Sequence, residues 1–383
     1  MRYRELGKTG LKVSEIGLGG EWLERHSAEE VHEIISFCEK QGINILDCFM
    51  SEPNVRSNIG AAIEGHREKW IIQGHIGSIW ENGQYTRTRD MKKVIPAFED
   101  LLLRLRTDYI DLGMIHYIDE PAEFHRVMEG DFFSYIEQLK ARKIIRHIGL
   151  STHNPEVASF AVQSKKIEVI LFSINPAFDM LPPTENLEDY YSLHTYQNHQ
   201  ELRGIAPERV ELYKNCEKAG VGITVMKGYG GGRLFSEQTS PFGVSLTPVQ
   251  CLHYALTRPA VSSVMVGFDS VCQVKEAVAY ETASEEAKDY ATVLSQAPAH
   301  AYYGQCTYCG HCAPCPAGID IAMVNKLYDL AVMQSQVPDS VKEHYHALSA
   351  SGKDCIVCKS CEKRCPFGVP IAERMKEANR LFG

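Results

Sequence analysis

The stretch DLGMIH, residues 111–116, decides the fold because it is one of eight short apolar runs of the same kind. Each run has the length of a buried strand, and a stretch with the apolar spacing of a helix follows it. The eight runs occupy residues 13–20, 43–48, 70–75, 111–116, 146–152, 169–175, 222–227 and 263–268. Eight such units predict a (β/α)8 TIM barrel over residues 1–295, with its active site at the carboxyl ends of the strands.

The C-terminal part carries two runs of four cysteines, CTYCGHCAPCP at 306–316 and CIVCKSCEKRCP at 355–366. The second run matches C-x2-C-x2-C-x3-C-P, by which bacterial ferredoxins bind four-iron clusters, and the first run shortens the last gap by one residue. Structural zinc is the alternative, but zinc ligands usually come as separated pairs. We therefore expect two [4Fe-4S] clusters, with ligands Cys306, Cys309, Cys312, Cys315, Cys355, Cys358, Cys361 and Cys365.

The resemblance to bacterial ferredoxins also implies how the cysteines are shared, because there the fourth cysteine of each run binds the other cluster. One cluster would take Cys365 with the first three cysteines of the first run. The other would take Cys315 with the first three of the second run. The segment between the runs has helical apolar spacing, so residues 296–383 are expected to form a small, mainly helical ferredoxin-like domain.

Composition narrows the range of functions. A formal net charge of −9 without a long basic run excludes the electrostatic signature of nucleic-acid or anionic-membrane binding. No signal-peptide core and no membrane-length apolar window are found, so we expect a cytoplasmic protein with reduced thiols. Exposed clusters are oxygen-labile, which favours an anaerobic setting. The five scattered cysteines are expected to be buried apolar residues, and Cys48, beside Asp47, is the one worth testing.

Beyond these patterns, the chain resembles the aldo-keto reductases, in the branch with a C-terminal ferredoxin domain. The resemblance covers essentially the whole chain, and it is carried by RELGKTGLKVSEIGLGG (4–20), DYIDLGMIH (108–116), HIGLSTHNPE (147–156), MKGYGGGRL (226–234) and SVMVGFDSVCQV (263–274). It implies a barrel that binds an extended nicotinamide cofactor. It also implies reduction of small carbonyl compounds by a tetrad of aspartate, tyrosine, lysine and histidine.

Two members of that tetrad differ in this chain. Asp47 and His116 stand where the family has its aspartate and histidine, whereas Glu52 replaces the tyrosine and His75 the lysine. The family's lysine lowers the pKa of the tyrosine, and neither replacement can do so. We expect Glu52, His75 and His116 to manage protons instead, with Asp47 orienting or neutralising one of them. The same four side chains are also the ligand set of a mononuclear iron, zinc or manganese site.

The expected cofactor residues are a mixture of retained and altered positions. Gly267, Ser270 and Gln273 stand where the family grips the adenosine end, and Asp269 would repel a 2′-phosphate, which favours NAD over NADP. The remaining candidates for this site are Ser151, Asn175 and Lys227. Thr152 and Leu171 depart from the family pattern around the nicotinamide.

A long insertion, residues 175–204, is rich in aromatic, histidine and amide groups. Loops of this length in a compact barrel are usually functional, so we expect a lid or a pocket wall. Tyr196 and His199 are its first candidates for contact with a substrate.

The leading hypothesis is an iron–sulfur oxidoreductase that passes electrons between its clusters and a small carbonyl or hydroxyl compound at the barrel mouth. Because nicotinamide delivers two electrons and a cluster passes one, a flavin, a metal ion or the substrate itself would have to mediate. A ferredoxin or flavodoxin is the expected external donor. Three alternatives stay open, namely an NAD(P)H-dependent carbonyl reductase with structural or sensing clusters, the mononuclear metal site, and a non-catalytic electron-transfer subunit.

Overall fold

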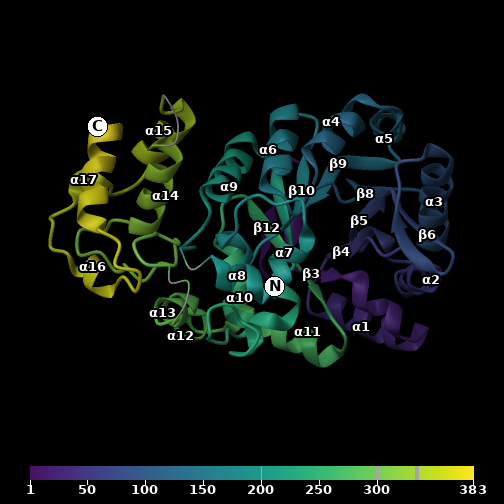
Figure 1. Ribbon diagram of the computed structural model, residues 1–383, viewed down its shortest axis with the longest axis horizontal. Coiled ribbons are helices and arrows are strands. Elements are labelled where there is room, and N and C mark those ends of the chain that lie inside the picture. Colours follow the sequence, from purple (N-terminus) through teal and green to yellow (C-terminus); the bar gives the residue numbers. More distant parts are fainter. Residues whose placement is uncertain (200, 299, 301, 333–335) are drawn as a thin grey trace.

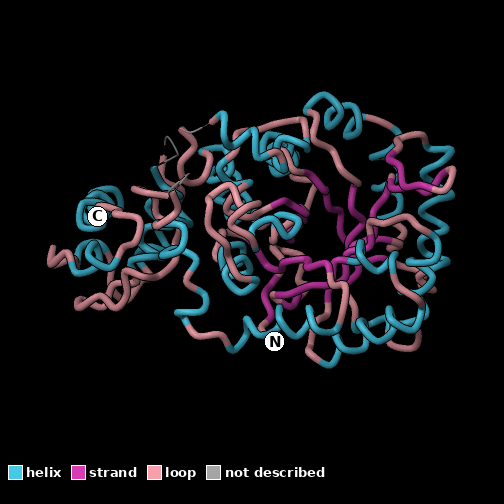
Figure 2. The backbone as a smooth tube through the Cα atoms, turned by 60° about the horizontal axis from the view of Figure 1, so that its bottom comes forward, coloured by secondary structure: helices cyan, strands magenta, loops and turns pink. Residues whose placement is uncertain are grey.

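The computed structural model describes residues 1–199, 201–298, 300, 302–332 and 336–383. It contains a closed barrel of eight parallel strands in the order β10-β11-β12-β3-β4-β5-β8-β9, which confirms the predicted fold (Figure 1). The strands are β3 (Ile16–Gly19), β4 (Ile45–Cys48), β5 (Ile71–Ile76), β8 (Ile110–Ile115), β9 (Ile145–Thr152), β10 (Val169–Ser173), β11 (Gly222–Met226) and β12 (Val261–Gly267). Figure 2 shows the strands inside a ring of helices.

The helices of residues 1–295 follow the barrel strands along the chain and surround the barrel. They are α1 (Ala28–Lys40), α2 (Pro53–Ala62), α3 (Met91–Arg104), α4 (Pro121–Glu129), α5 (Asp131–Ala141), α6 (Pro155–Ser164), α7 (Leu187–Tyr191), α8 (Leu193–Asn198), α9 (Pro207–Ala219), α10 (Pro248–Leu256), α11 (Val271–Val278), α12 (Glu285–Lys288) and α13 (Tyr290–Ser295). Several begin with an oxygen-bearing cap, such as Ser27 of α1, which accepts the backbone N–H of Glu30.

The barrel interior is closed at the amino ends of the strands by a hairpin of β1 (Tyr3–Glu5) and β2 (Lys12–Ser14). Leu6 and Val13 of this hairpin belong to the same buried cluster as Ile45 and Val169, the first residues of β4 and β10. The predicted run 13–20 is thus divided between the hairpin and β3. Apolar side chains thus seal this end of the barrel interior, and in this architecture the site lies at the carboxyl ends of the strands.

A second hairpin lies at the carboxyl end of β5 and consists of β6 (Ser78–Glu81) and β7 (Gln84–Arg87). Its two-residue turn is Asn82-Gly83, and both residues have positive φ values, 54° and 76°. These are the backbone angles that a tight hairpin turn with the right-handed twist requires, and Asn-Gly adopts them readily. The turn therefore folds the chain back over the barrel mouth.

The small domain lies to one side of the barrel and contains α14 (Ile321–Val332), α15 (Asp339–His346), α16 (Ser360–Arg364) and α17 (Ile371–Phe382) (Figure 1). Polar contacts join it to the barrel. The Arg258 guanidinium donates to the carbonyl oxygen of Thr307 at 2.6 Å, and Lys326 pairs with Glu217 at 2.6 Å. None of the helices in the described part of the chain is long and apolar enough to cross a membrane.

Candidate active site

A cavity of about 1020 Å³ opens at the carboxyl ends of the barrel strands. Its wall includes residues from the ends of β5, β8, β9, β11 and β12, among them His75, His116, Ser151, Met226 and Gly267. Ionisable side chains brought together in one concave site are the usual starting point for a catalytic assignment.

Four side chains in this cavity form one continuous chain of hydrogen bonds. His75 Nε2 lies 2.9 Å from Asp47 Oδ1, and His75 Nδ1 lies 2.8 Å from His116 Nδ1. The hydroxyl of Tyr85 is hydrogen-bonded to His116 Nε2. We name this chain the relay, and its members are Asp47, His75, His116 and Tyr85.

The proton positions in the relay follow from a single consistent assignment. The Asp47 carboxylate can only accept, so His75 carries its proton on Nε2 and accepts at Nδ1. His116 then donates from Nδ1 and accepts at Nε2 the proton of the Tyr85 hydroxyl. Every donor points toward Asp47, which also accepts from Gln73 Nε2 at 2.9 Å. The relay is therefore poised to carry a proton inward from Tyr85 to the buried carboxylate.

Burial controls the charge of the relay. Desolvation lowers the pKa of His116 well below its ordinary value, and the neighbouring His75 and the cation of Arg89 lower it further. Desolvation also raises the pKa of Tyr85, although Arg87 and Arg89 oppose that rise. Near neutral pH, His116 is thus a neutral imidazole and Tyr85 a neutral phenol. Both can exchange a proton without holding a buried charge at rest.

The hairpin β6–β7 brings Tyr85 to the relay, and two arginines that follow Tyr85 hold the hairpin in place. Arg87 Nη1 donates to the carbonyl oxygen of Tyr117 at 2.6 Å, and Arg89 Nη2 donates to that of His116 at 2.6 Å. Both guanidinium groups also pair with Glu123, at 3.4 and 3.0 Å. The hairpin is therefore fixed to the strand end that carries His116.

Three of the four expected catalytic residues come together, and Glu52 does not. Glu52 is the N-cap of α2, where its carboxylate accepts the backbone N–H of Val55 at 2.6 Å. The expected set missed Tyr85, which takes the place beside His116. Among the described residues, no group of three histidine, cysteine, aspartate or glutamate side chains is close enough to hold a single metal ion, so the mononuclear site has no support in this geometry.

Four of the six expected cofactor residues line the cavity, namely Ser151, Lys227, Gly267 and Gln273. The other two serve the local fold. The Asn175 side chain donates to the carbonyl oxygen of Lys227 at 2.9 Å and accepts two backbone N–H groups of the next turn, while Ser270 caps α11. These two polar side chains are thus used in turns and caps.

The insertion 175–204, apart from residue 200, which lies outside the described residues, contributes Leu187 to the cavity wall. Tyr196 is buried, and its hydroxyl donates to the carbonyl oxygen of Tyr190. His199 is exposed and pairs with Glu201 at 2.9 Å. Neither expected contact residue reaches the cavity. Cys48 is buried outside the cavity, and desolvation raises the pKa of its thiol to about 11, which makes it unreactive.

Part of the expected grouping of cysteines is seen in the small domain. Cys315, Cys355, Cys358 and Cys361 line one small enclosed cavity, the set expected for the second cluster. In the other group, Cys312 lies near Cys309 and Cys365, and also near Cys361. The eight cysteines stay the predicted ligands of two four-iron clusters.

The aldo/keto reductase family model matches residues 15–246, well over half of the chain. The chain belongs to this family. A second model, the 4Fe-4S dicluster domain, matches residues 276–370. The two matches together make the protein an iron–sulfur oxidoreductase, which confirms the expected combination of domains.

Relatives share the barrel part. The oxidoreductase YqkF of Bacillus subtilis (strain 168) is 28% identical over 289 residues, which cover 72% of this chain and 90% of YqkF. L-galactose dehydrogenase of Arabidopsis thaliana is 26% identical over 316 residues, covering 74% and 89%. The solved structure of aldo-keto reductase AKR11C1 from Bacillus halodurans in its holo form aligns with a TM-score of 0.58 at 23% identity, covering 75% of this chain and 94% of that chain, which supports the barrel fold.

Proposed function

We propose that the protein interconverts a small carbonyl compound and its alcohol in the barrel cavity and exchanges the two electrons one at a time with its iron–sulfur clusters. The observation that carries this proposal is the relay, which provides a proton path at the place where a substrate oxygen would bind. Its hydrogen bonds run from Tyr85 through two imidazoles to Asp47.

In the direction of alcohol oxidation, the substrate hydroxyl donates its proton to the Tyr85 oxygen as Tyr85 releases its own proton to His116 Nε2. His116 passes a proton from Nδ1 to His75, and His75 passes one from Nε2 to Asp47. One proton has then moved from the substrate oxygen to the buried carboxylate, with each imidazole left neutral. Carbonyl reduction uses the same steps in reverse and starts after Asp47 has taken up a proton from solvent.

The charges that line the cavity disfavour the nicotinamide cofactor that the fold family suggests. Its lining carries Glu21, Asp269 and Glu276 at the end expected for the dinucleotide, against one ammonium group, Lys227. That ammonium lies 3.6 Å from Glu21 and is thereby already paired. A pyrophosphate would meet an excess of negative charge, and the extra phosphate of NADP would meet Asp269 as well. We therefore derive no hydride transfer in this cavity.

The two cluster sites differ in their surroundings, which suggests a path for electrons. Next to Cys306, the carbonyl oxygen of Thr307 accepts from Arg258, which follows α10, and from Tyr290 of α13, so the first site adjoins the barrel. The second site is near solvent, with Ile356 and Val357 66% and 61% exposed. When bound, four-iron clusters accept and release electrons singly. Electrons would enter at the surface site and pass inward.

The surface around the second site suggests the external partner. We define the outer-cluster face as residues 353–364, in which four cations, Lys353, Lys359, Lys363 and Arg364, outnumber two carboxylates. This is a basic patch on a chain of net charge −9. Complementary charge steers encounter between redox partners. We propose a small acidic one-electron carrier as the occupant of this face.

The test is an anaerobic titration of the purified protein, in which the visible absorbance of the clusters is followed. NADH and NADPH should leave the absorbance unchanged, and dithionite should bleach it. Adding a small aldehyde to the reduced protein should then restore the absorbance as alcohol forms. Turnover of the aldehyde with NADH or NADPH as the sole reductant would show that the proposal is wrong.

A further inference from the structure

Removal of two electrons from an alcohol as single electrons releases two protons. In hydride transfer the hydrogen on carbon leaves with both electrons, whereas in a stepwise path it leaves as a proton and needs an acceptor of its own. The relay can exchange a proton with the substrate oxygen, but it provides no acid–base group for the substrate carbon. We propose that His153, oriented by Asp119, is a second acid–base group in this cavity and exchanges the proton on the substrate carbon. This inference rests on the proposed function.

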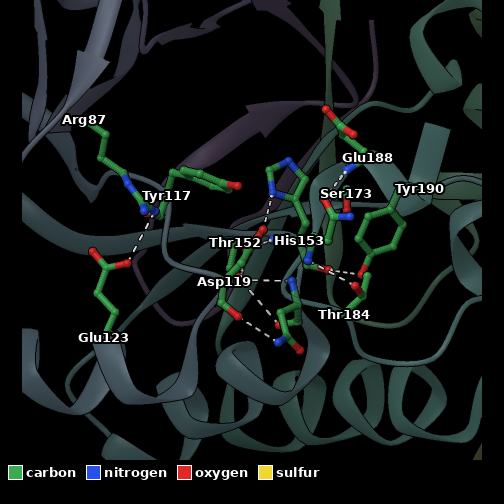
Figure 3. Close-up of polar contacts among 12 residues, drawn as sticks. Arg87, Tyr117, Asp119, Glu123, Thr152, His153, Ser173, Thr184, Glu188 and Tyr190 are labelled. Carbon is green, nitrogen blue, oxygen red and sulfur yellow. Dashed lines mark hydrogen bonds and ion pairs between the residues drawn. The ribbon is translucent and has the colours of Figure 1, made fainter. Parts of the chain in front are cut away.

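The Asp119–His153 pair has the geometry of an oriented imidazole. Asp119 Oδ2 lies 3.0 Å from His153 Nδ1, and Asp119 Oδ1 accepts the backbone N–H of His153 at 2.6 Å (Figure 3). The hydroxyl of Thr152 donates to the same oxygen at 2.8 Å. Burial would raise the pKa of Asp119, but these hydrogen bonds lower it below its ordinary value. The carboxylate stays ionised and accepts the proton on His153 Nδ1.

His153 belongs to the cavity wall, and its second ring nitrogen is not used by the fold. His153 is 5% exposed and lines the cavity, and among the described residues its Nε2 forms no hydrogen bond. The backbone behind the ring is fixed, because the carbonyl oxygen of His153 accepts from the Tyr190 hydroxyl at 2.9 Å and from Arg209 Nη2 at 3.3 Å. An imidazole with one nitrogen on a carboxylate and the other free is arranged as a general base.

Tyr117 stands between His153 and the relay. Its ring centroid lies 5.3 Å from that of His153 and 6.2 Å from that of His116, and Arg87 covers it at 4.6 Å. Tyr117 has a φ of 43°, a conformation that bulky residues rarely adopt and that is concentrated at functional sites. Tyr117 therefore separates the relay from the Asp119–His153 pair, so that the two can exchange protons with different atoms of one substrate.

The balanced steps of reduction are as follows. One electron and one proton from Tyr85 convert the carbonyl to a hydroxy radical centred on carbon. A second electron and a proton from His153 Nε2, which this nitrogen has first taken up from solvent, complete the C–H bond of the alcohol. The sum is R₂C=O + 2 e⁻ + 2 H⁺ → R₂CHOH. The electrons come from the one-electron donor of the proposed function, and both protons return from solvent.

The origin of the hydrogen on carbon tests this inference. The dithionite-reduced, cluster-containing protein is given benzaldehyde or glyceraldehyde in D₂O, and deuterium at the carbinol carbon is measured by NMR. The native protein should place deuterium there. His153→Gln should slow turnover about a hundredfold or more, with little change in probe dissociation constant. His125→Gln, an exposed histidine on α4, is the matched control and should behave as the native protein.

A spectroscopic measurement separates orientation from folding. In ¹⁵N-histidine spectra, His153 should show the Nδ1–H tautomer, and Asp119→Asn should shift it toward the other tautomer while slowing turnover. His153→Gln with native turnover and native deuterium would overturn the inference and leave the proposed function standing. Deuterium delivered from 4-deuterated NADH instead of solvent would overturn both. A native protein that reduces neither probe would also contradict both.

Discussion

At the scale of single residues, Tyr85 is the group whose loss should most affect turnover. Tyr85→Phe keeps the ring but removes the hydroxyl that joins the substrate oxygen to His116. We expect the rate of aldehyde reduction to fall about 10²- to 10⁴-fold with little change in melting temperature. The matched control is Tyr117→Phe, which removes another hydroxyl at the cavity outside the relay and should retain most of the rate. A Tyr85→Phe rate within threefold of the native rate would mean that the relay ends elsewhere.

The same residues show which parts of the site could be predicted from the sequence and which could not. Asp47, His75 and His116 were predictable because each lies at the carboxyl end of a strand, and barrel geometry brings such ends together. The sequence-based role for Glu52 finds no support, since the residue begins a helix and its carboxylate serves as the cap. His153 was missed because its function depends on Asp119, a contact between loops that no sequence spacing reveals.

At the scale of elements, the β6–β7 hairpin differs most from the sequence-based prediction, because it brings Tyr85 to the site. The missing tyrosine was sought at a fixed distance after Asp47, whereas the structure supplies one from a different loop. A signal was available, since Asn82-Gly83 flanked by an alternating pattern is a strong hairpin signature. Even so, the direction of a hairpin over the barrel mouth is set by its anchors, here the contacts of Arg87 and Arg89 with backbone oxygens.

Weakening one anchor should therefore affect catalysis through the position of Tyr85. Arg89→Lys keeps the charge but loses the forked contacts to His116, Tyr117 and Glu123. We expect turnover to fall about ten- to a hundredfold and amide exchange in residues 78–87 to increase. Lys93→Met breaks the exposed pair with Glu81 at the far side of the hairpin and should change neither quantity measurably. Equal effects of the two substitutions would contradict the anchoring role.

Helix α10 contains a histidine that should make stability depend on pH. Burial lowers the pKa of His253 from 6.5 to about 4. Between these values the unfolded chain binds more protons than the folded one, so stability falls as pH falls, with a slope of up to about 1.4 kcal/mol per unit from this residue. Urea midpoints at pH 7.5, 6.5 and 5.5 should show a shallower decline for His253→Gln than for His32→Gln, an exposed control. Identical slopes would refute the assignment.

At the scale of the whole molecule, both domains were predictable because their signals repeat along the chain, as eight apolar runs and two cysteine runs. The contacts by which the two domains join could not be predicted from the sequence. They are individual polar contacts between distant residues, such as Lys214 Nζ donating to the carbonyl oxygen of Asp329 at 2.5 Å and His311 pairing with Asp289 at 2.8 Å. These contacts orient the molecule with one cluster site against the barrel and the other toward solvent.

In the proposed function, that orientation would make the outer-cluster face the entry point for electrons. Lys359→Glu, with Lys359 62% exposed beside the second site, should slow reduction by an acidic ferredoxin at low salt by about tenfold and flatten the dependence of the rate on ionic strength. Reduction by dithionite should change much less, because a small reductant needs no docking surface. Lys92→Glu, an exposed lysine on α3 of the barrel, makes the same change of charge far from the clusters and should leave the ferredoxin rate unaltered. If both substitutions slowed the ferredoxin equally, net charge rather than this face would govern the encounter, and the carrier would have to dock elsewhere.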